Sequence, residues 1–218
     1  MLCVVAEDFL QNVLSFAYLI IIICAAFFAG DSVSAEFDKR TCLSSFPLPI
    51  RRISFYSGKY IAAFAATSLM VSIYYVLGYV EAVSIYGAEN VPGLYVLSFT
   101  VALLYTMAVT SFTYFFSCIL KSGITSTLIS FFSLFMIFPI IQFVLLLSKV
   151  EPVYVITYAG DLITGVFGAI PFNIGDAGSE FDVTFTSPSF MAGTSCMLAY
   201  ALLFYLLGTF IGTRKEVQ

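Results

Sequence analysis

Residues 31–59 have the sequence DSVSAEFDKRTCLSSFPLPIRRISFYSGK, a polar segment between two long apolar stretches. This segment holds five of the nine Lys and Arg residues of the chain. Lys and Arg gather in the cytosolic loops of membrane proteins. If the apolar stretches cross a membrane, the segment lies on the cytosolic side and sets the orientation of the neighbouring helices.

The composition is that of an integral membrane protein. Hydrophobic residues make up 61% of the 218 residues, charged residues make up only 10%, and the mean hydropathy is +1.01. Soluble domains are about a quarter charged. We expect a single transmembrane domain over residues 1–218, surrounded by the lipid bilayer. No basic stripe remains beyond the charges that set the topology, so nucleic-acid binding is not expected.

Five apolar segments are long enough to cross a bilayer as helices, which takes about 20 residues each. We predict an all-α integral membrane protein whose transmembrane helices cover residues 11–30, 60–86, 93–120, 124–148 and 190–212. The second of these is longer than a bilayer requires, so we expect it to tilt or to project from the membrane.

The charges of the connecting segments agree with one orientation. The segments 87–92 and 149–189 are mainly acidic, which places them outside the cytosol, whereas the turn at 121–123 and the C-terminal tail carry Lys or Arg. With five helices, this pattern predicts an extracytosolic N-terminus and a cytosolic C-terminus. We expect a multi-pass protein of the plasma membrane.

The connection between the last two spans is long and only moderately apolar. Residues 153–172, VYVITYAGDLITGVFGAIPF, contain Asp161. A full span here would place the basic C-terminal tail outside, against the charge pattern. We predict that residues 150–189 form a pair of short re-entrant or interfacial helices on the extracytosolic side, followed by a polar stretch of strands or turns. Irregular backbone at membrane depth needs the shelter of other helices, so we expect this segment to pack into the bundle.

The sequence lacks the residue sets of common enzymes. It has no His, no GxxxxGK[ST] phosphate-binding loop and no GxSxG motif. Its five cysteines do not have the spacing of a metal site. We therefore expect no catalytic activity, metal or cofactor in this chain. An intramembrane enzyme is an alternative for which no catalytic residues are visible.

Three residues inside the predicted spans are candidates for a substrate pathway or a kink, because polar groups and prolines are costly in membrane helices. Glu81 lies near the outer end of its helix, where we expect a solvated carboxylate. Pro139 removes one helical hydrogen bond and can kink its helix. Gln142, one turn later, predicts an interhelical amide bond, with substrate contact as the alternative.

The polar segment itself predicts an amphipathic elbow over residues 31–58. A short helix over residues 34–45 would pair Glu36 with Lys39 and Arg40 at helical spacing. The prolines that follow would end this helix, and a second short helix, opening at the Arg pair, would lead into the membrane. The elbow either anchors the bundle to lipid headgroups or docks a soluble partner.

The same segment resembles a motif of ATP-binding-cassette (ABC) type-2 permeases. In that family a Glu is followed by Gly-Thr-Leu, then by Pro and Ser-Arg, and Gly-Lys opens the next helix. The matching positions here are Glu36, Thr41, Pro49, Arg51, Arg52, Gly58 and Lys59. Two positions depart from the family, since Arg40 replaces its Gly and the small polar residue before the first Arg is missing. The order of spans and loops also matches, so the resemblance covers essentially the whole chain.

The resemblance implies a permease subunit. Such a subunit pairs with a second permease subunit, identical or paralogous, and exports a substrate using ATP and Mg bound by a separate cytosolic ABC ATPase subunit. The residues implied to form the ATPase-coupling elbow are Glu36, Phe37, Arg40, Thr41, Pro49, Arg51, Arg52 and Lys59. The family usually has six helices, so we expect that its first helix is missing here, through a truncated reading frame or because another subunit supplies it. The alternative is a membrane substrate-binding module without an ATPase partner.

Overall fold

The computed structural model describes residues 2–38, 52–88, 91–148, 152–167, 172–174, 183–185 and 189–214. Within this part of the chain, five helices are long and apolar enough to cross a membrane. They are Phe9–Glu36, Ile53–Tyr86, Leu94–Ile119, Gly123–Leu147 and Phe190–Arg214. The prediction of five helices of membrane-spanning length is confirmed.

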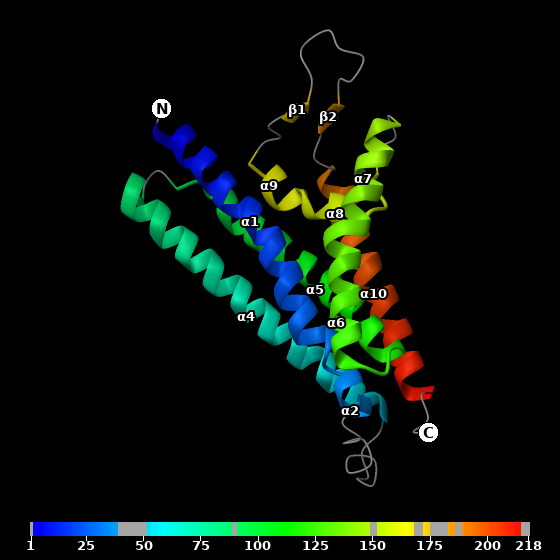
Figure 1. Cartoon of the computed structure of the whole chain (residues 1–218). Helices are drawn as coiled ribbons and strands as arrows, with labels where there is room; N and C mark the ends of the chain where they lie inside the picture. The colour runs from blue at the N-terminus through cyan, green and yellow to red at the C-terminus, as the bar shows by residue number, and fades with distance from the viewer. Residues whose placement is uncertain are drawn as a thin grey trace.

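The secondary structure is almost entirely helical (Figure 1). In chain order the elements are α1 (Leu2–Gly30), α2 (Ser34–Asp38), α4 (Arg52–Tyr86), α5 (Leu94–Ile119), α6 (Gly123–Phe132), the π-helical turn η2 (Ser133–Ile137), α7 (Phe138–Leu147), α8 (Ile156–Gly160), α9 (Leu162–Gly165), β1 (Phe172–Ile174), β2 (Val183–Phe185) and α10 (Phe190–Arg214).

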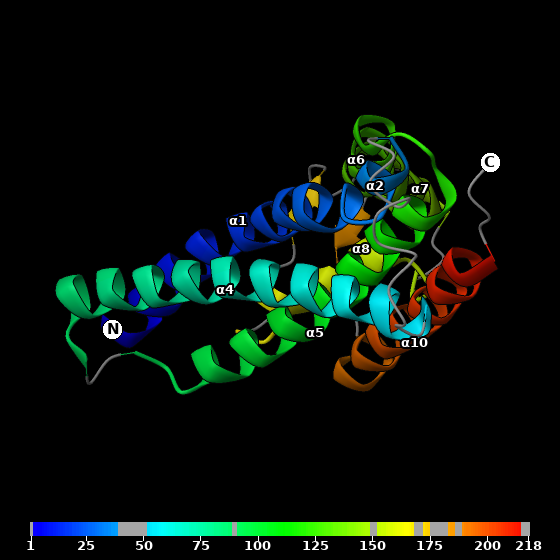
Figure 2. The same cartoon turned by 90° about the horizontal axis from the view of Figure 1, so that it is seen from below.

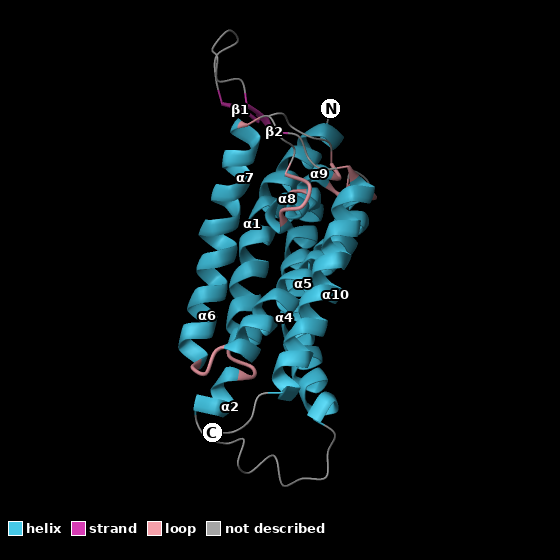
Figure 3. Ribbon diagram, turned by 90° about the vertical axis from the view of Figure 1, so that its right-hand side faces the viewer, coloured by secondary structure: helices cyan, strands magenta, loops and turns pink. Residues whose placement is uncertain are grey.

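Helix α5 lies at the centre of the bundle. It packs against α1, α4, α6 and α10, and Figures 1 and 3 show it between these helices. In its apolar window 56% of the residues are buried, against 11% in the window of Gly123–Leu147. The hydroxyls of Thr106, Thr110 and Thr113 donate to carbonyls one turn earlier in α5. These polar atoms are thus satisfied within the helix, and the small side chains let the neighbouring helices approach.

The connections between the spans fall at two ends of the bundle. We call the end that carries α2, the first turns of α4 and the last turn of α10 the elbow end. The opposite end, which we call the far end, carries the start of α1, the short helices α8 and α9, and both strands (Figure 1). Figure 2, the view from below, shows α2 beside α6 at the elbow end.

Helix α1 begins at Leu2, well before the predicted start at residue 11. Leu10, just before the predicted span, is fully buried, as are Leu14 and Ile21 within it. These residues lie at helical spacing, so the buried face of the helix continues toward the N-terminus. Phe9 packs against Tyr86 near the end of α4, with ring centroids 5.7 Å apart. This contact gives the first turns of α1 a partner outside the predicted span.

Helix α4 corrects the predicted two-part elbow. The expected second short helix is instead the first part of one continuous helix of 35 residues, Arg52–Tyr86. Helix α4 contains no proline, so its backbone hydrogen bonds continue from the polar segment into the span. Gly58 does not interrupt it either, because it lies on an open face where an added Cβ would meet no atom within 4 Å. Of the short helix predicted over residues 34–45, α2 forms the first part, and the remainder falls outside the described residues.

The fourth span is not a regular α-helix. It consists of α6, the π-helical turn η2 and α7, and the backbone N–H of Phe138 donates to the carbonyl of Ser133, five residues earlier. Pro139 follows directly. Its ring has no N–H and would collide with the carbonyl four residues before it in a regular α-helix. The wider π-helical turn relieves that conflict.

The connection after α7 contains two short helices and a strand pair. All five residues of α8 are buried, as are Leu162 and Ile163 of α9. The two helices pack against α1, α5, α7 and α10. Beyond them, β1 and β2 pair antiparallel with Phe172 opposite Phe185. The short helices thus lie among the spans, and their depth in a bilayer stays a prediction.

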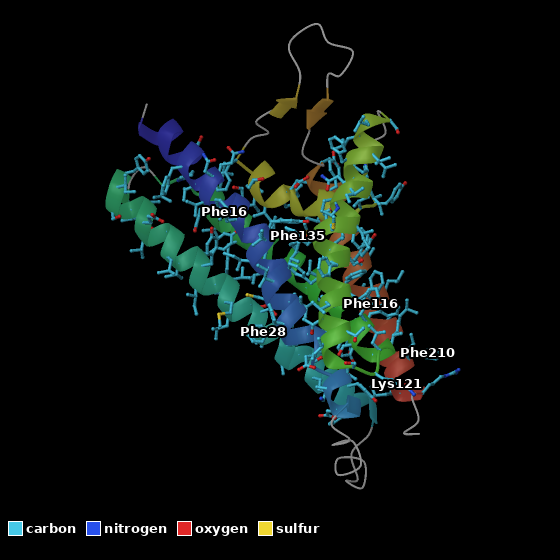
Figure 4. The ribbon with its side chains drawn as sticks, in the orientation of Figure 1. Phe16, Phe28, Phe116, Lys121, Phe135 and Phe210 are labelled. Atoms are coloured by element: carbon cyan, nitrogen blue, oxygen red, sulfur yellow. The ribbon has the colours of Figure 1, made fainter. Side chains whose placement is uncertain are left out.

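The outer surface of the bundle is apolar. Figure 4 shows Phe16 on α1, Phe135 in η2 and Phe210 on α10, and these side chains are 65%, 45% and 53% exposed. Helix α7 has no buried residue at all. Such a surface is stable in contact with lipid tails or other membrane helices, and a soluble protein would not expose it. The fold is therefore that of a multi-pass membrane protein.

The close crossing of α1 and α6 predicts the effect of one substitution. An ideal Cβ on Gly30 would lie 2.9 Å from the backbone Cα of Thr127, so Gly30→Ala forces the two helices apart. Overpacking of this kind costs about 1–3 kcal/mol. We expect a lower Tm for Gly30→Ala in detergent, measured by far-UV circular dichroism.

Gly58→Ala is the matched control, since its Cβ meets nothing and alanine is the better helix former by about 1 kcal/mol. An equal Tm for both variants would contradict the close crossing.

Candidate functional site

An ion pair joins the two sides of the polar segment. The Glu36 Oε1 atom on α2 lies 2.6 Å from the Nζ atom of Lys59 on α4, and the two side chains are 25% and 19% exposed. The Lys59 ammonium also donates to the carbonyl of Ser32 and lies 5.2 Å from the centroid of the Phe55 ring. Because the pair is partly buried, solvent screens it less than an exposed pair, which contributes about 0–1 kcal/mol. It holds α2 against the first turns of α4.

Helix α2 is also fixed by a buried serine of α5. The Ser117 hydroxyl oxygen accepts hydrogen bonds from the backbone N–H groups of Val33 at 3.0 Å and Ser34 at 3.1 Å. The first N–H groups of a helix have no partner within it, and Ser117 supplies one from another helix. The Ser34 hydroxyl in turn donates to the carbonyl of Gly30. The end of α1 and the start of α2 are thereby tied to α5.

Asp31 extends these contacts to α6. Its Oδ1 atom occupies the space above Gly123, where an added Cβ would lie only 1.9 Å away. Gly123 is the first residue of α6, and the positive end of the helix dipole there stabilises a carboxylate. The segment between α1 and α2 therefore contacts both α5 and α6.

A group of aromatic side chains lies under the elbow. Tyr56 and Tyr60 of α4 pack with Tyr114 of α5 in one buried cluster. The Tyr60 hydroxyl bonds to the Ser111 hydroxyl at 2.9 Å, and the Tyr114 hydroxyl donates to the Tyr56 carbonyl. A further hydrogen bond of 2.9 Å links the hydroxyls of Ser57 and Tyr205, which connects α4 to α10. The first turns of α4 are thus bound to α5 and α10.

Of the predicted elbow residues, Glu36 and Lys59 are the two that the structure brings together. Lys59 is a partner of Glu36 that helical spacing does not predict, and the fold supplies it by placing the start of α4 against α2. Both expected partners, Lys39 and Arg40, lie outside the described residues, and so do the other predicted elbow residues, Thr41, Pro49 and Arg51. Phe37 lies in α2 and Arg52 begins α4.

Of the contact residues Asp31, Ser117 and Gly123, only Asp31 could be singled out from the sequence. Ser117 was one of many Ser and Thr residues in apolar segments, and its two backbone donors come from a distant part of the chain. The position of Asp31 and Ser32 directly after an apolar stretch was the one available signal.

The candidates within the spans lie toward the far end. Glu81 is exposed on α4, and Pro139 follows the π-helical turn. The Nε2 atom of Gln142 donates to Oδ2 of Asp161 at 2.8 Å. This bond joins α7 to the junction of α8 and α9, and it gives the interhelical amide a charged partner.

Asp161 belongs to a cluster of polar side chains that we call the Asp161 cluster. Its members come from α1, α5, α7 and the α8–α9 connection, and they are Tyr18, Tyr105, Gln142, Thr157 and Asp161. The Asp161 side chain keeps an accessible surface, yet nearby protein atoms partly desolvate its carboxylate. This burial raises the pKa of Asp161 to about 6, and the hydrogen bond from Gln142 opposes part of the increase.

Two apolar recesses lie along the outer helices. One, of about 420 Å³, is bounded by α4 and α5 near the far end and includes Tyr75, Tyr79 and Phe99. The other, of about 580 Å³, lies beside α10 and includes Tyr154, Cys196 and Tyr200. Neither contains a carboxylate, Lys or Arg among the described residues, so their chemistry suits apolar groups. Within that same part of the chain, no three His, Cys, Asp or Glu side chains converge as a metal site would require.

Comparison with known proteins adds no assignment: no protein-family model and no curated protein matches this chain.

The Glu36–Lys59 ion pair leads to a charge-swap prediction. Glu36→Lys or Lys59→Glu alone places like charges together, and each should lower the Tm, with a cost of about 1–3 kcal/mol. The double variant restores opposite charges and should recover part of the loss. The measurement is far-UV circular dichroism of the purified chain.

Glu81→Lys, on an exposed carboxylate, is the control and should shift the stability by less than about 0.5 kcal/mol. A double variant that loses as much as the sum of the single variants would show that the pair does not couple α2 to α4.

The raised pKa of Asp161 predicts a pH dependence of stability. Because burial favours the protonated form, the folded chain binds this proton more tightly than the unfolded chain. The contribution of Asp161 is therefore most favourable below about pH 4 and declines as the pH rises towards 6. We expect Asp161→Asn to be more stable than the parent chain at pH 7.5, with a smaller difference at pH 4.5, in Tm measurements without alkali metal ions. A pH-independent difference would contradict the raised pKa.

Proposed function

We propose that this chain is the transmembrane permease subunit of an ABC-type transporter, which exports a substrate with ATP hydrolysed by a separate cytosolic ATPase subunit. The ion pair between Glu36 and Lys59 is the observation that carries the proposal. These two residues occupy the first and last positions of the motif that resembles the coupling segment of type-2 permeases. Their contact links α2, in the segment that would bind the ATPase, to α4, the helix that would move when the ATPase changes conformation.

Coupling requires that a displacement at the cytosolic surface move the membrane helices. Helix α2 is held by Lys59 of α4 and by Ser117 of α5, and Asp31 contacts the start of α6. The aromatic group below it extends the connection to α10. A force applied to α2 would therefore act on several spans at once, as ATP-driven closure of paired ATPase subunits demands.

The distribution of positive charge supports a cytosolic elbow end. Lys59 lies beside α2, and Figure 4 shows Lys121 at the same end of the bundle. Arg214, in the last turn of α10, also lies there, with its guanidinium 4.2 Å from the centroid of the Phe210 ring. By the positive-inside rule, this arrangement favours a cytosolic C-terminus and an extracytosolic start of α1 in a plasma membrane.

Assembly with a second permease subunit, a copy or a paralogue, completes the proposal. The exposed apolar face of α6, η2 and α7 supports it, since α7 has no buried residue. In such an assembly each permease subunit would engage one ATPase subunit, which supplies the ATP and Mg site.

Retention of the ATPase tests the proposal. The tagged chain is co-expressed with a cytosolic ABC ATPase subunit encoded beside it and purified in detergent. We expect the ATPase to be retained and the Arg51→Glu/Arg52→Glu variant to lose most of it, because acidic side chains would replace two of the basic groups of the elbow. Retention is measured by quantitative immunoblotting.

Glu81→Lys, at the far end, is the control and should retain the ATPase fully. A chain that never retains an ABC ATPase, although it folds with five spans, would favour the alternative of a membrane substrate-binding module whose elbow anchors to lipid. Exposed Ile53 at the start of α4, 64% accessible, suits that alternative.

A further inference from the structure

Three hydroxyl groups of the Asp161 cluster are buried and lack a well-formed hydrogen bond. Tyr105 and Thr157 are 0% and 2% exposed, and among the described residues no atom lies in hydrogen-bond geometry with their hydroxyl oxygens or with that of Tyr18. The Tyr18 and Tyr105 hydroxyls do interact with each other. A buried polar group that makes no hydrogen bond costs about 1–3 kcal/mol. The Tyr18 and Tyr105 oxygens, which both act on Asp161, therefore keep lone pairs that can bind a ligand beside its carboxylate.

The geometry brings these hydroxyls together beside one carboxylate. An added Cβ on Gly160 would lie 3.0 Å from Cζ of Tyr105, the atom that bears its hydroxyl, and 3.0 Å from Cδ2 of Tyr18. Both rings thus press on the backbone of the residue before Asp161, and they stack with centroids 5.6 Å apart. Thr157 lies one helical turn before Asp161, so its side chain shares the same helix face.

The carboxylate of Asp161 lacks a positive partner within the described part of the chain. The hydrogen bond that it accepts comes from the neutral amide of Gln142. A carboxylate in such a position is a natural site for a cation, because it has no opposite charge beside it within this part of the chain. The Asp161 side chain keeps an accessible surface, so a small ligand can reach it.

We propose that the Asp161 cluster binds one monovalent cation, either an alkali metal ion or the ammonium group of an organic molecule. The ligand set consists of oxygen atoms, which hard cations prefer and to which an ammonium group donates hydrogen bonds. One carboxylate balances a single positive charge. A divalent ion prefers several carboxylates, and among the described residues no group of three or more His, Cys, Asp or Glu side chains could hold a metal ion.

The site lies on the helices that the elbow contacts at their other ends. Tyr18 is on α1 and Tyr105 is on α5, and these helices carry Gly30 and Ser117 against α2. Occupation of the site would therefore bias the same helices that ATP-driven closure moves. That consequence rests on the proposed transport function, whereas the binding itself does not.

Thermal stability of the purified full chain in detergent tests the proposal. At pH 7.5 and constant ionic strength, N-methyl-D-glucamine is replaced stepwise by Na⁺, by K⁺ or by methylammonium, and the Tm is followed by far-UV circular dichroism. A ligand that binds the folded state raises the Tm in a saturable way. We expect such a rise with at least one of the three, a complete loss of it in Asp161→Asn, and an apparent affinity about tenfold weaker in Tyr105→Phe.

The comparison of ions identifies the source of the charge. A rise with Na⁺ or K⁺ alone assigns an inorganic ion, and a rise with methylammonium alone assigns an organic ammonium group. Glu7→Gln, which removes a carboxylate of α1 outside the cluster, is the control and should keep the full response. If no cation raises the Tm, or if Asp161→Asn responds like the parent chain, the proposal is wrong.

The response should also depend on pH. Protonation of Asp161 at pH 5 should weaken the apparent affinity about tenfold relative to pH 7.5. The titratable groups that interact with it electrostatically among the described residues are Tyr18 of α1 and Tyr105 of α5, and tyrosine hydroxyls do not ionise between pH 5 and pH 7.5. Equal affinities at the two pH values would overturn the role of Asp161. No ATPase enters the measurement, so its outcome is independent of the retention experiment.

Discussion

The ion pair between Glu36 and Lys59 determines how the elbow end is built. Helix α2 has only five residues and is too short to be stable without contacts to other helices. With the ion pair, α2 lies against α4, where the buried Ser117 hydroxyl satisfies two of its free N–H groups. Asp31 and the tyrosines of α4 and α5 then complete a set of contacts among five helices. A polar segment between two spans thereby becomes a rigid part of the bundle.

The far end differs, because its polar groups lack a full set of well-formed hydrogen bonds within the described residues. Asp161 accepts a hydrogen bond from the neutral amide of Gln142 and lies near the buried hydroxyls of Tyr18 and Tyr105. Buried polar groups of this kind need an explanation, and the proposed cation supplies one. Helices α1 and α5 run through both regions. The proposed coupling elbow and the proposed cation site thus share their two most buried helices.

Close packing at small residues makes this shared framework possible. Gly30 brings α1 onto the backbone of α6, and Gly160 lets two tyrosine rings lie on α8. Small residues promote helix association in lipid, where the hydrophobic effect does not drive helices together. The π-helical turn before Pro139 adds an irregular segment to the outermost span. The bundle therefore combines a tightly packed centre around α5 with a loosely packed outer span that is available for lipid or a partner.

The sequence by itself determined the five spans, because about 20 consecutive apolar residues are a local property that needs no knowledge of the fold. It also located the polar segment, the short helices around Asp161 and the disturbance at Pro139. Sequence patterns did not predict contacts between residues that are distant in the chain. Glu36 pairs with Lys59 of another helix, and Gln142 meets Asp161 across a loop. Only the tertiary structure decided these contacts, and it also merged the predicted second elbow helix into α4, because helix packing, unlike hydropathy, depends on which faces the whole bundle brings together.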